Sequence, residues 1–297
     1  MDLSPVGVWT FNLDLLPIPA AQEMVAEIEE LGYGAVWIPE AMGRDPMAHA
    51  PLLLAGGKRI VLATGIANIW NRSPVAMSAG QRTITSAFPD RFLLGLGVSH
   101  GAFVEGFLHE DYKRPLTKMK AYLDAMDAAP FMADAPTTEP KRVLAALGPK
   151  MLKLAAERAA GAHPYFVPVE HTAFARKTLG PEPLLCVEQA VVLSTDAEVA
   201  RAAARAHMAI YLTLPNYTNN LRRFGFGDED FDNGGSDLLV DTLVVWGDVD
   251  DVATRVRAHH DAGANHVCLQ VLSTLPADVR NPPIEQWRAL APALGLG

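Results

Sequence analysis

The sequence is poor in cysteine, in long apolar runs and in positive charge, and each shortage excludes a class of protein. Cys186 and Cys268 are the only cysteines among 297 residues, and they lack the close spacing of a zinc site, an iron–sulfur cluster or a disulfide framework. No run of about 18 apolar residues is present, so no transmembrane helix is expected. Lys and Arg number 25 against 34 Asp and Glu. Neither nucleic acid nor an anionic membrane is therefore the expected partner.

Signals for export and for metal binding are also lacking. The first residues carry neither the positive region nor the apolar segment of a signal peptide, so we expect a cytoplasmic protein. No His-x-x-x-His pair with a Glu occurs, and no metal site is predicted. His259 and His260 fall on a predicted surface helix and are expected to be solvated. No low-complexity linker divides the chain, so we expect a single domain over 1–297.

What is present is an alternation of short apolar runs with longer amphipathic segments. In 20–31, for example, Met24, Ile28 and Leu31 recur at helical spacing. The predicted strands are 6–11, 35–38, 59–66, 91–98, 142–147, 162–167, 184–193 and 266–271. The predicted helices are 20–31, 46–55, 74–88, 115–128, 149–160, 170–179, 196–212, 249–262 and 283–294. The segment 213–237 is polar and rich in Gly, Asn and Asp, which predicts an insertion or a mobile loop.

This alternation predicts a parallel sheet covered by helices on both faces. About eight βα units in a chain of this length favour a (β/α)8 TIM barrel, and a doubly wound open sheet is the alternative. In either fold the functional residues lie at the C-terminal ends of the strands. The first five strand ends combine aromatic side chains, one carboxylate, one imidazole and glycines. Such a set suits a flat heteroaromatic cofactor.

Four residues at these ends have both a functional and a structural interpretation. Glu40 is a candidate general acid/base or cofactor contact, or else an ion-paired surface residue. His100 is a candidate proton donor or substrate contact, or else a hydrogen-bonded structural histidine. Trp9 and Trp70 are candidate walls of a substrate pocket, or else core residues.

Gly148, Pro149 and Lys150 form the best candidate for a phosphate site. A helix is predicted to begin there, so its free N–H groups and the positive end of its dipole face a ligand anion. Lys150 and Lys153 would add positive charge. The alternative is an ordinary helix start with proline in its first turn.

The segment 97–101 matches G-x-S-x-G, which would make Ser99 the nucleophile of a serine hydrolase. That motif requires a helix directly after the turn, and Gly106 argues against a helix there. Gly95 and Gly97 also begin a dinucleotide-binding fingerprint. Its third glycine is replaced by His100, so a Rossmann site is not favoured.

The chain resembles the bacterial luciferase-like family of flavin and deazaflavin oxidoreductases. The resemblance rests on segments that occur in the order and spacing of the family: 31–40, 64–66, 73–74, 88–97 and 261–267. They are most similar to the branch that uses coenzyme F420 rather than FMN. The resemblance implies a (β/α)8 barrel with a late insertion, a homodimer, and hydride transfer between C5 of F420 and a small organic substrate.

The resemblance also implies roles for individual residues. Glu40 would contact the cofactor at the end of the second strand, and Gly65 and Ile66 would form a bulge behind the ring, with a cis peptide between them. The implied cofactor-binding residues are Glu40, Gly65, Ile66, Ala67, Asn68, Val98, Ser99, Leu147, Gly148 and Lys150. The candidate catalytic residues are His100 and Glu40, and the residues themselves make Trp9 and Trp70 candidates for the substrate pocket.

Two positions depart from family members that oxidise sugar phosphates. Those members carry His after the acid of the second strand, where this chain has Ala41, and Glu after the glycine of the fourth strand, where it has His100. Their acid/base set therefore does not transfer, and the substrate stays open. The alternatives are an FMN-dependent monooxygenase, a Ser99 hydrolase, and a barrel that binds F420 or a partner without catalysis.

Overall fold

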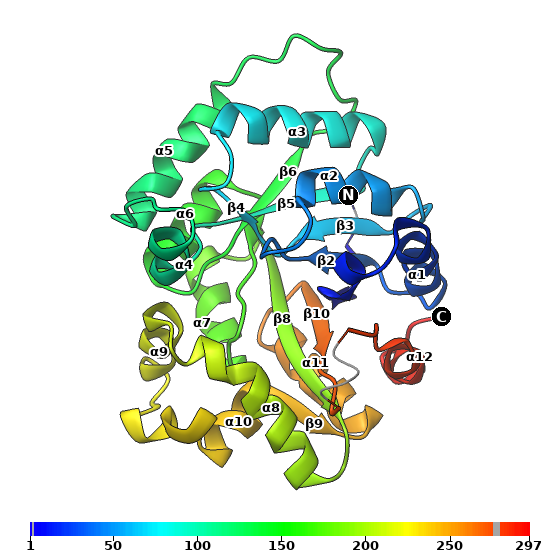
Figure 1. Cartoon of the computed structure of the whole chain (residues 1–297), viewed down its shortest axis with the longest axis vertical. Coiled ribbons are helices and arrows are strands. Elements are labelled where there is room, and N and C mark those ends of the chain that lie inside the picture. Colours follow the sequence, from blue (N-terminus) through cyan, green and yellow to red (C-terminus); the bar gives the residue numbers. More distant parts are fainter. Residues whose placement is uncertain (2, 276–279) are drawn as a thin grey trace.

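A closed barrel of parallel strands forms the centre of the molecule (Figure 1). The computed structural model describes residue 1 and residues 3–275 and 280–297. In these residues β10 pairs with both β8 and β1, which closes the sheet. The barrel strands are β1 (Val6–Trp9), β2 (Ala35–Ile38), β3 (Val61–Thr64), β5 (Phe92–Gly97), β6 (Lys141–Leu144), β7 (Gly161–Ala162), β8 (Leu184–Leu193) and β10 (His266–Val271). Closure confirms the barrel and excludes the open sheet.

Helices surround the barrel, and several begin at side-chain caps that the sequence provides. Asp45, Ser73 and Asp196 each accept hydrogen bonds from backbone N–H groups in the first turn of the following helix. The helices are α1 (Ile18–Glu30), α2 (Pro46–Leu54), α3 (Pro74–Ala87), α4 (Gly101–Gly106), α5 (Pro115–Asp127), α6 (Pro149–Arg158), α7 (Val169–Leu179), α8 (Ala197–Tyr211), α9 (Pro215–Arg222), α10 (Asp237–Leu243), α11 (Val249–Asp261) and α12 (Ile284–Ala293). In the described part of the chain, every helix is too short or too polar to span a bilayer.

The barrel interior is filled by aromatic and small side chains. Trp37 stacks on His163 with 4.3 Å between ring centroids, and its Nε1 donates to His266. Cys186 and Cys268 are buried free thiols in the same interior. Burial raises the pKa of the Cys186 thiol to about 12, so this group is inert at neutral pH.

The late part of the chain differs from the prediction. The segment 213–237, expected to be an insertion or a mobile loop, contains α9 and two 3-10 turns, Asp228–Asp230 and Asp232–Gly234. The strand β9 (Val244–Gly247), which pairs with the second half of β8, was not predicted. Helix α9 is polar in composition, yet it buries Tyr217, Asn220 and Leu221, and these tertiary contacts are not visible in a local pattern.

Two further expectations are wrong. A short helix, α4, does begin at Gly101, although Gly106 argued against one; Gly106 is its last residue. His259 is not solvated but fully buried. Its ring nitrogens contact Thr172 Oγ1 at 2.8 Å and Gln189 Oε1 at 2.9 Å, because the outward face of β8 presents a polar side chain to α11.

Candidate active site at the barrel mouth

The barrel mouth is the end of the barrel at which the strands finish, and Glu40 lies there after β2. Its carboxylate binds Arg72 through two hydrogen bonds of 2.8 and 2.6 Å and accepts a third from the backbone N–H of Asn68. Burial alone would lower the pKa of Arg72, but hydrogen bonds and charge from Glu40 and Asp45 raise it. Arg72 therefore stays a cation held against the Glu40 carboxylate. This geometry suits a residue that fixes the 68–72 turn better than one that transfers protons.

Gly65 and Ile66 form the expected bulge after β3, and the peptide between them is cis, as predicted. A Cβ at Gly65 would lie 2.6 Å from Trp9 Nε1 and 3.0 Å from His163 Nε2. A Cβ at Gly97 would lie 2.5 Å from two side-chain carbons of Ile66. Gly95 and Gly97, which suggested a dinucleotide fingerprint, therefore make room for Thr64 and Ile66 on either side of Gly65.

Ala67 and Asn68 form the short strand β4, which pairs with the end of β5. The amide oxygen of Asn68 accepts from the backbone N–H of Trp70 at 3.1 Å, and Trp70 Nε1 donates to the carbonyl of Val98 at 3.0 Å. The strand ends that carry Glu40, Asn68 and Val98 are thus tied into one rigid rim.

Trp9 lies behind the bulge rather than beside open solvent. Its Nε1 donates to the carbonyl of Gly65 at 3.3 Å, and its ring packs against Tyr165 with 5.4 Å between centroids. Only 6% of Trp9 is exposed. Trp70 is half-buried, with Lys118 Nζ 4.5 Å from its ring centroid. Of the two, Trp70 is the one more available to a ligand.

Ser99 has the positive φ, 56°, that a nucleophile elbow requires, and α4 follows it. Its carbonyl accepts from Tyr112 Oη at 3.1 Å. Among the described residues, however, no hydrogen bond joins Ser99 Oγ to an imidazole or carboxylate, and the neighbouring His100 is turned toward α9. The geometry therefore does not support a hydrolase.

His100 caps the N-terminus of α4 and contacts two residues of α9. Its Nδ1 lies 3.1 Å from Asn216 Oδ1, and its ring centroid lies 5.4 Å from that of Tyr217. Burial lowers the pKa of His100 and outweighs the opposing effect of the Asn216 hydrogen bond, so the ring is neutral at pH 7. Because Nδ1 donates to an acceptor, Nε2 keeps its lone pair and can accept a proton.

Leu147, Gly148 and Lys150 lie at the start of α6. His171 Nε2 donates to the carbonyl of Leu147 at 2.8 Å and fixes the turn, and Gly148 is the N-cap residue without a side-chain cap. Lys150 is exposed. A residue that sequence reasoning missed, Arg223, lies here as well, because a Cβ at Gly148 would be 3.4 Å from its Nη1.

Sequence reasoning also missed a tyrosine cluster, made of Tyr165, Tyr211 and Tyr217, between the end of β7 and the helices α8 and α9. The hydroxyl groups of Tyr165 and Tyr211 are 2.8 Å apart, and Tyr165 donates to Gln270 Oε1 at 2.8 Å. Beneath the cluster lies Glu188, whose Oε2 accepts from the backbone N–H of Phe166 at 3.1 Å. Tyr165 was missed because it falls within the predicted strand 162–167. In the structure β7 ends at Ala162, and the residues after it turn into the mouth.

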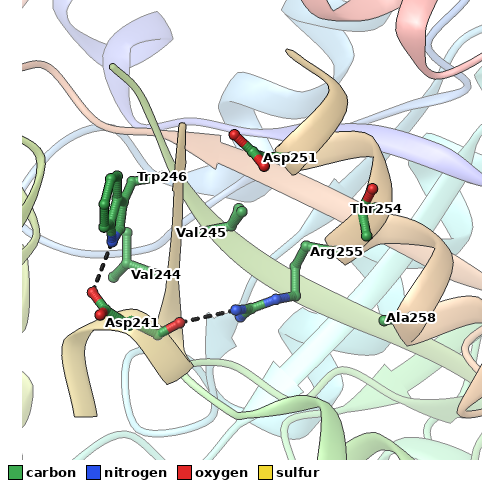
Figure 2. A pocket seen from close by; sticks show the side chains of 8 residues that line it. All are labelled: Asp241, Val244, Val245, Trp246, Asp251, Thr254, Arg255 and Ala258. Atoms are coloured by element: carbon green, nitrogen blue, oxygen red, sulfur yellow. Dashed lines mark hydrogen bonds between the residues drawn. The ribbon is translucent and has the colours of Figure 1, made fainter. Parts of the chain in front are cut away.

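A pocket of about 350 Å³ lies away from the mouth, between α10, β9 and α11 (Figure 2). Its charged groups bind within the protein: Asp241 accepts from Trp246 Nε1 at 2.7 Å, and Arg255 donates to the carbonyls of Asp241 and Thr242. The hydrogen-bonding groups of Asp241 and Arg255 are thus used within the protein, and the pocket lies away from the strand ends that carry Glu40, Asn68 and Val98.

The residues at the mouth fit a flat ring that carries an anionic group. Trp9 and His163 pack directly behind Gly65, and at the start of α6 the backbone N–H of Lys150 has no partner among the described residues and lies near Arg223. Within the described residues, no group of three or more His, Cys, Asp or Glu side chains is arranged to hold a metal ion.

Comparison with known proteins agrees with this geometry. The family model for luciferase-like monooxygenases matches residues 6–266, and the chain belongs to this family of enzymes. A Mycobacterium tuberculosis protein, provisionally named coenzyme F420-dependent oxidoreductase Rv3520c, is 27% identical, with 81% of this chain and 87% of the relative covered.

Solved structures share the fold at lower identity. An F420-dependent secondary alcohol dehydrogenase, in complex with an F420–acetone adduct, superimposes with a TM-score of 0.77 at 15% identity and covers 99% of both chains. The oxygenating constituent of 3,6-diketocamphane monooxygenase of Pseudomonas putida, in complex with FMN, has a TM-score of 0.66 at 16% identity and covers 98% of this chain and 96% of the other. The fold therefore occurs with both cofactors.

Proposed function

We propose that this enzyme is an oxidoreductase that transfers a hydride between coenzyme F420 and a small organic substrate. The observation that carries the proposal is the pairing at one barrel mouth of the bulge after β3, packed from behind by Trp9, with an uncapped helix N-terminus beside Arg223. The first suits the face of a deazaflavin ring and the second suits its phosphate. The name of the Mycobacterium tuberculosis relative supports the choice of F420.

In this proposal F420 supplies the carbon that accepts or donates the hydride. Ala67 and Asn68, with Val98 and Ser99, line the edge of the ring. Glu40 acts through Arg72 and the backbone of Asn68 by holding the 68–72 turn in place. Leu147, Gly148 and Lys150 hold the phosphate.

His100 handles the proton and Trp70 bounds the substrate. The neutral Nε2 accepts a proton as the substrate loses a hydride, and returns it in the reverse direction. Arg72 is shared by Glu40 and Asp45 and so offers no free cation to a substrate anion, and we propose an uncharged substrate. A homodimer and a cytoplasmic location belong to the same proposal and rest on the family resemblance.

FMN is the second candidate cofactor, because the fold also occurs with bound FMN. Both molecules carry a tricyclic ring and a ribityl phosphate, so the same residues would hold either one. In that case the enzyme would be a flavin-dependent monooxygenase.

A substrate screen tests the proposed activity. Purified protein is incubated with F420 and a panel of alcohols, and with reduced F420 and a panel of enones, imines and nitroaromatics, while the absorbance of oxidised F420 is followed. We expect turnover with at least one uncharged class. Tight F420 binding without turnover would instead indicate a non-catalytic barrel, and covalent labelling of Ser99 by a fluorophosphonate would indicate a hydrolase.

A further inference from the structure

Helix α9 touches three separate parts of the barrel mouth. Asn216, in its first turn, contacts His100 after β5, and Tyr217 packs against Tyr165 and Phe166 after β7. Beyond its last turn, Arg223 reaches Gly148 at the start of α6. Figure 1 shows α9 in yellow, at the lower left beside α4 and α7. The helix therefore connects the candidate catalytic residue with the candidate phosphate site.

Arg223 is a positive charge without a carboxylate partner among the described residues. Its Nη1 donates to Asn220 Oδ1 at 3.2 Å, and the guanidinium otherwise lies against Gly148. The N-terminus of α6 carries partial positive charge of its own. Two like charges that face each other are unfavourable unless an anion lies between them.

Asn220 supplies an independent observation at the same place. It is only 1% exposed, and its Nδ2 is a buried donor without a partner among the residues that the structure describes. The other atom of the same amide, Oδ1, accepts from the Nη1 of Arg223 that lies against Gly148, so the amide is adjacent to the guanidinium at the start of α6. An unsatisfied buried donor costs about 1–3 kcal/mol, which a ligand acceptor would recover.

We propose that the cofactor phosphate binds between the N-terminus of α6 and Arg223 with Asn220, and so docks α9 across the mouth. This inference rests on the proposed function, because it needs a phosphate-bearing cofactor. Asn216 already lies against His100, so docking would stabilise this contact rather than create it. A bound phosphate would thereby stabilise the position of His100, the proton-transferring residue. Arg223 would bind the phosphate directly and act on His100 only through α9.

The test compares two ligands that differ only in the phosphate: the deazaflavin FO and its 5′-phosphate. Their affinities are measured for the wild type, for Arg223→Met, and for the control Arg222→Met. Arg222 is adjacent in sequence, but it pairs with exposed Asp228 instead. We expect the wild type to bind FO 5′-phosphate about 10- to 100-fold more tightly than FO, as charge-assisted hydrogen bonds allow.

In Arg223→Met this preference should fall about 10-fold, while the affinity for FO, which reports an intact fold, stays unchanged. Arg222→Met should behave as the wild type. Hydrogen exchange of the α9 amides should slow with FO 5′-phosphate but not with FO, and only when Arg223 is present. An unchanged preference in Arg223→Met would overturn the inference. A wild type that binds neither ligand would instead refute the proposed function.

Discussion

Replacing His100 by alanine is expected to lower kcat by about 10²–10⁴-fold, the range for loss of a general acid or base. His100 follows β5 at the barrel mouth, and burial keeps its pKa below the ordinary value, so the ring is a neutral proton acceptor. Cofactor affinity should change little, because the ring bonds to Asn216 and not to the start of α6. The measurement is steady-state turnover with a substrate from the screen, together with an F420 titration.

His100→Gln separates proton transfer from hydrogen bonding. If the ring only orients the substrate, the glutamine variant should recover part of the lost turnover. If His100 merely ties the β5–α4 turn to α9, both variants should lose about 1 kcal/mol of stability and keep their turnover. That result would remove His100 from the mechanism.

The wild type is expected to lose stability as the pH rises from 5 to 8, and replacing Glu188 by glutamine is expected to remove most of this pH dependence. Glu188 is 2% exposed inside the barrel, and its Oε1 has no hydrogen-bond partner in the described part of the chain. Burial raises its pKa from 4.5 to about 8, against the effect of the Phe166 N–H. One pKa unit is worth roughly 1.4 kcal/mol, so the stability of the wild type should fall behind that of Glu188→Gln by up to about 5 kcal/mol as the pH rises.

The sign follows from proton binding. Between pH 4.5 and 8 the folded state keeps the proton of Glu188 while the unfolded state releases it, so stability is complete below that window and is lost through it. The neighbouring tyrosines of the cluster have pKa values raised by burial and titrate above it. Denaturant unfolding of both proteins from pH 5 to 9 gives the difference, and exposed Glu182→Gln serves as control. Parallel curves for wild type and Glu188→Gln would show that Glu188 is ionised in the fold.

Much of the fold could be predicted from the sequence, because the barrel is built from local regularities. The segment 35–38 is buried on both faces and reads as an unbroken apolar run, and α1 shows its apolar stripe at helical spacing. The start of α6 at Gly148 could be anticipated for the same reason, whereas the predicted strand 59–66 ran through the bulge at Gly65, which only the family resemblance implied.

The rest of the site depends on contacts between segments far apart in the sequence. Arg223 lies 75 residues after Gly148, on a helix that is polar and short, so no periodicity marks it. The pattern around His259 is typical of a surface helix. In the structure, however, the ring is buried against β8 and its Nε2 lies 2.9 Å from Gln189 Oε1. Glu188 sits within the apolar run of β8, and only closure of the barrel shows that it faces inward with one oxygen unpaired. Tertiary pairing of polar groups leaves no local pattern.

The most direct test of the proposed function is a side-by-side titration of the purified apoprotein with F420 and with FMN, followed by ligand fluorescence or calorimetry. We predict saturable F420 binding at micromolar concentration or below, and much weaker binding of FMN. Micromolar affinity for FMN with no detectable affinity for F420 would contradict the proposal and make the enzyme a flavin-dependent member of the family.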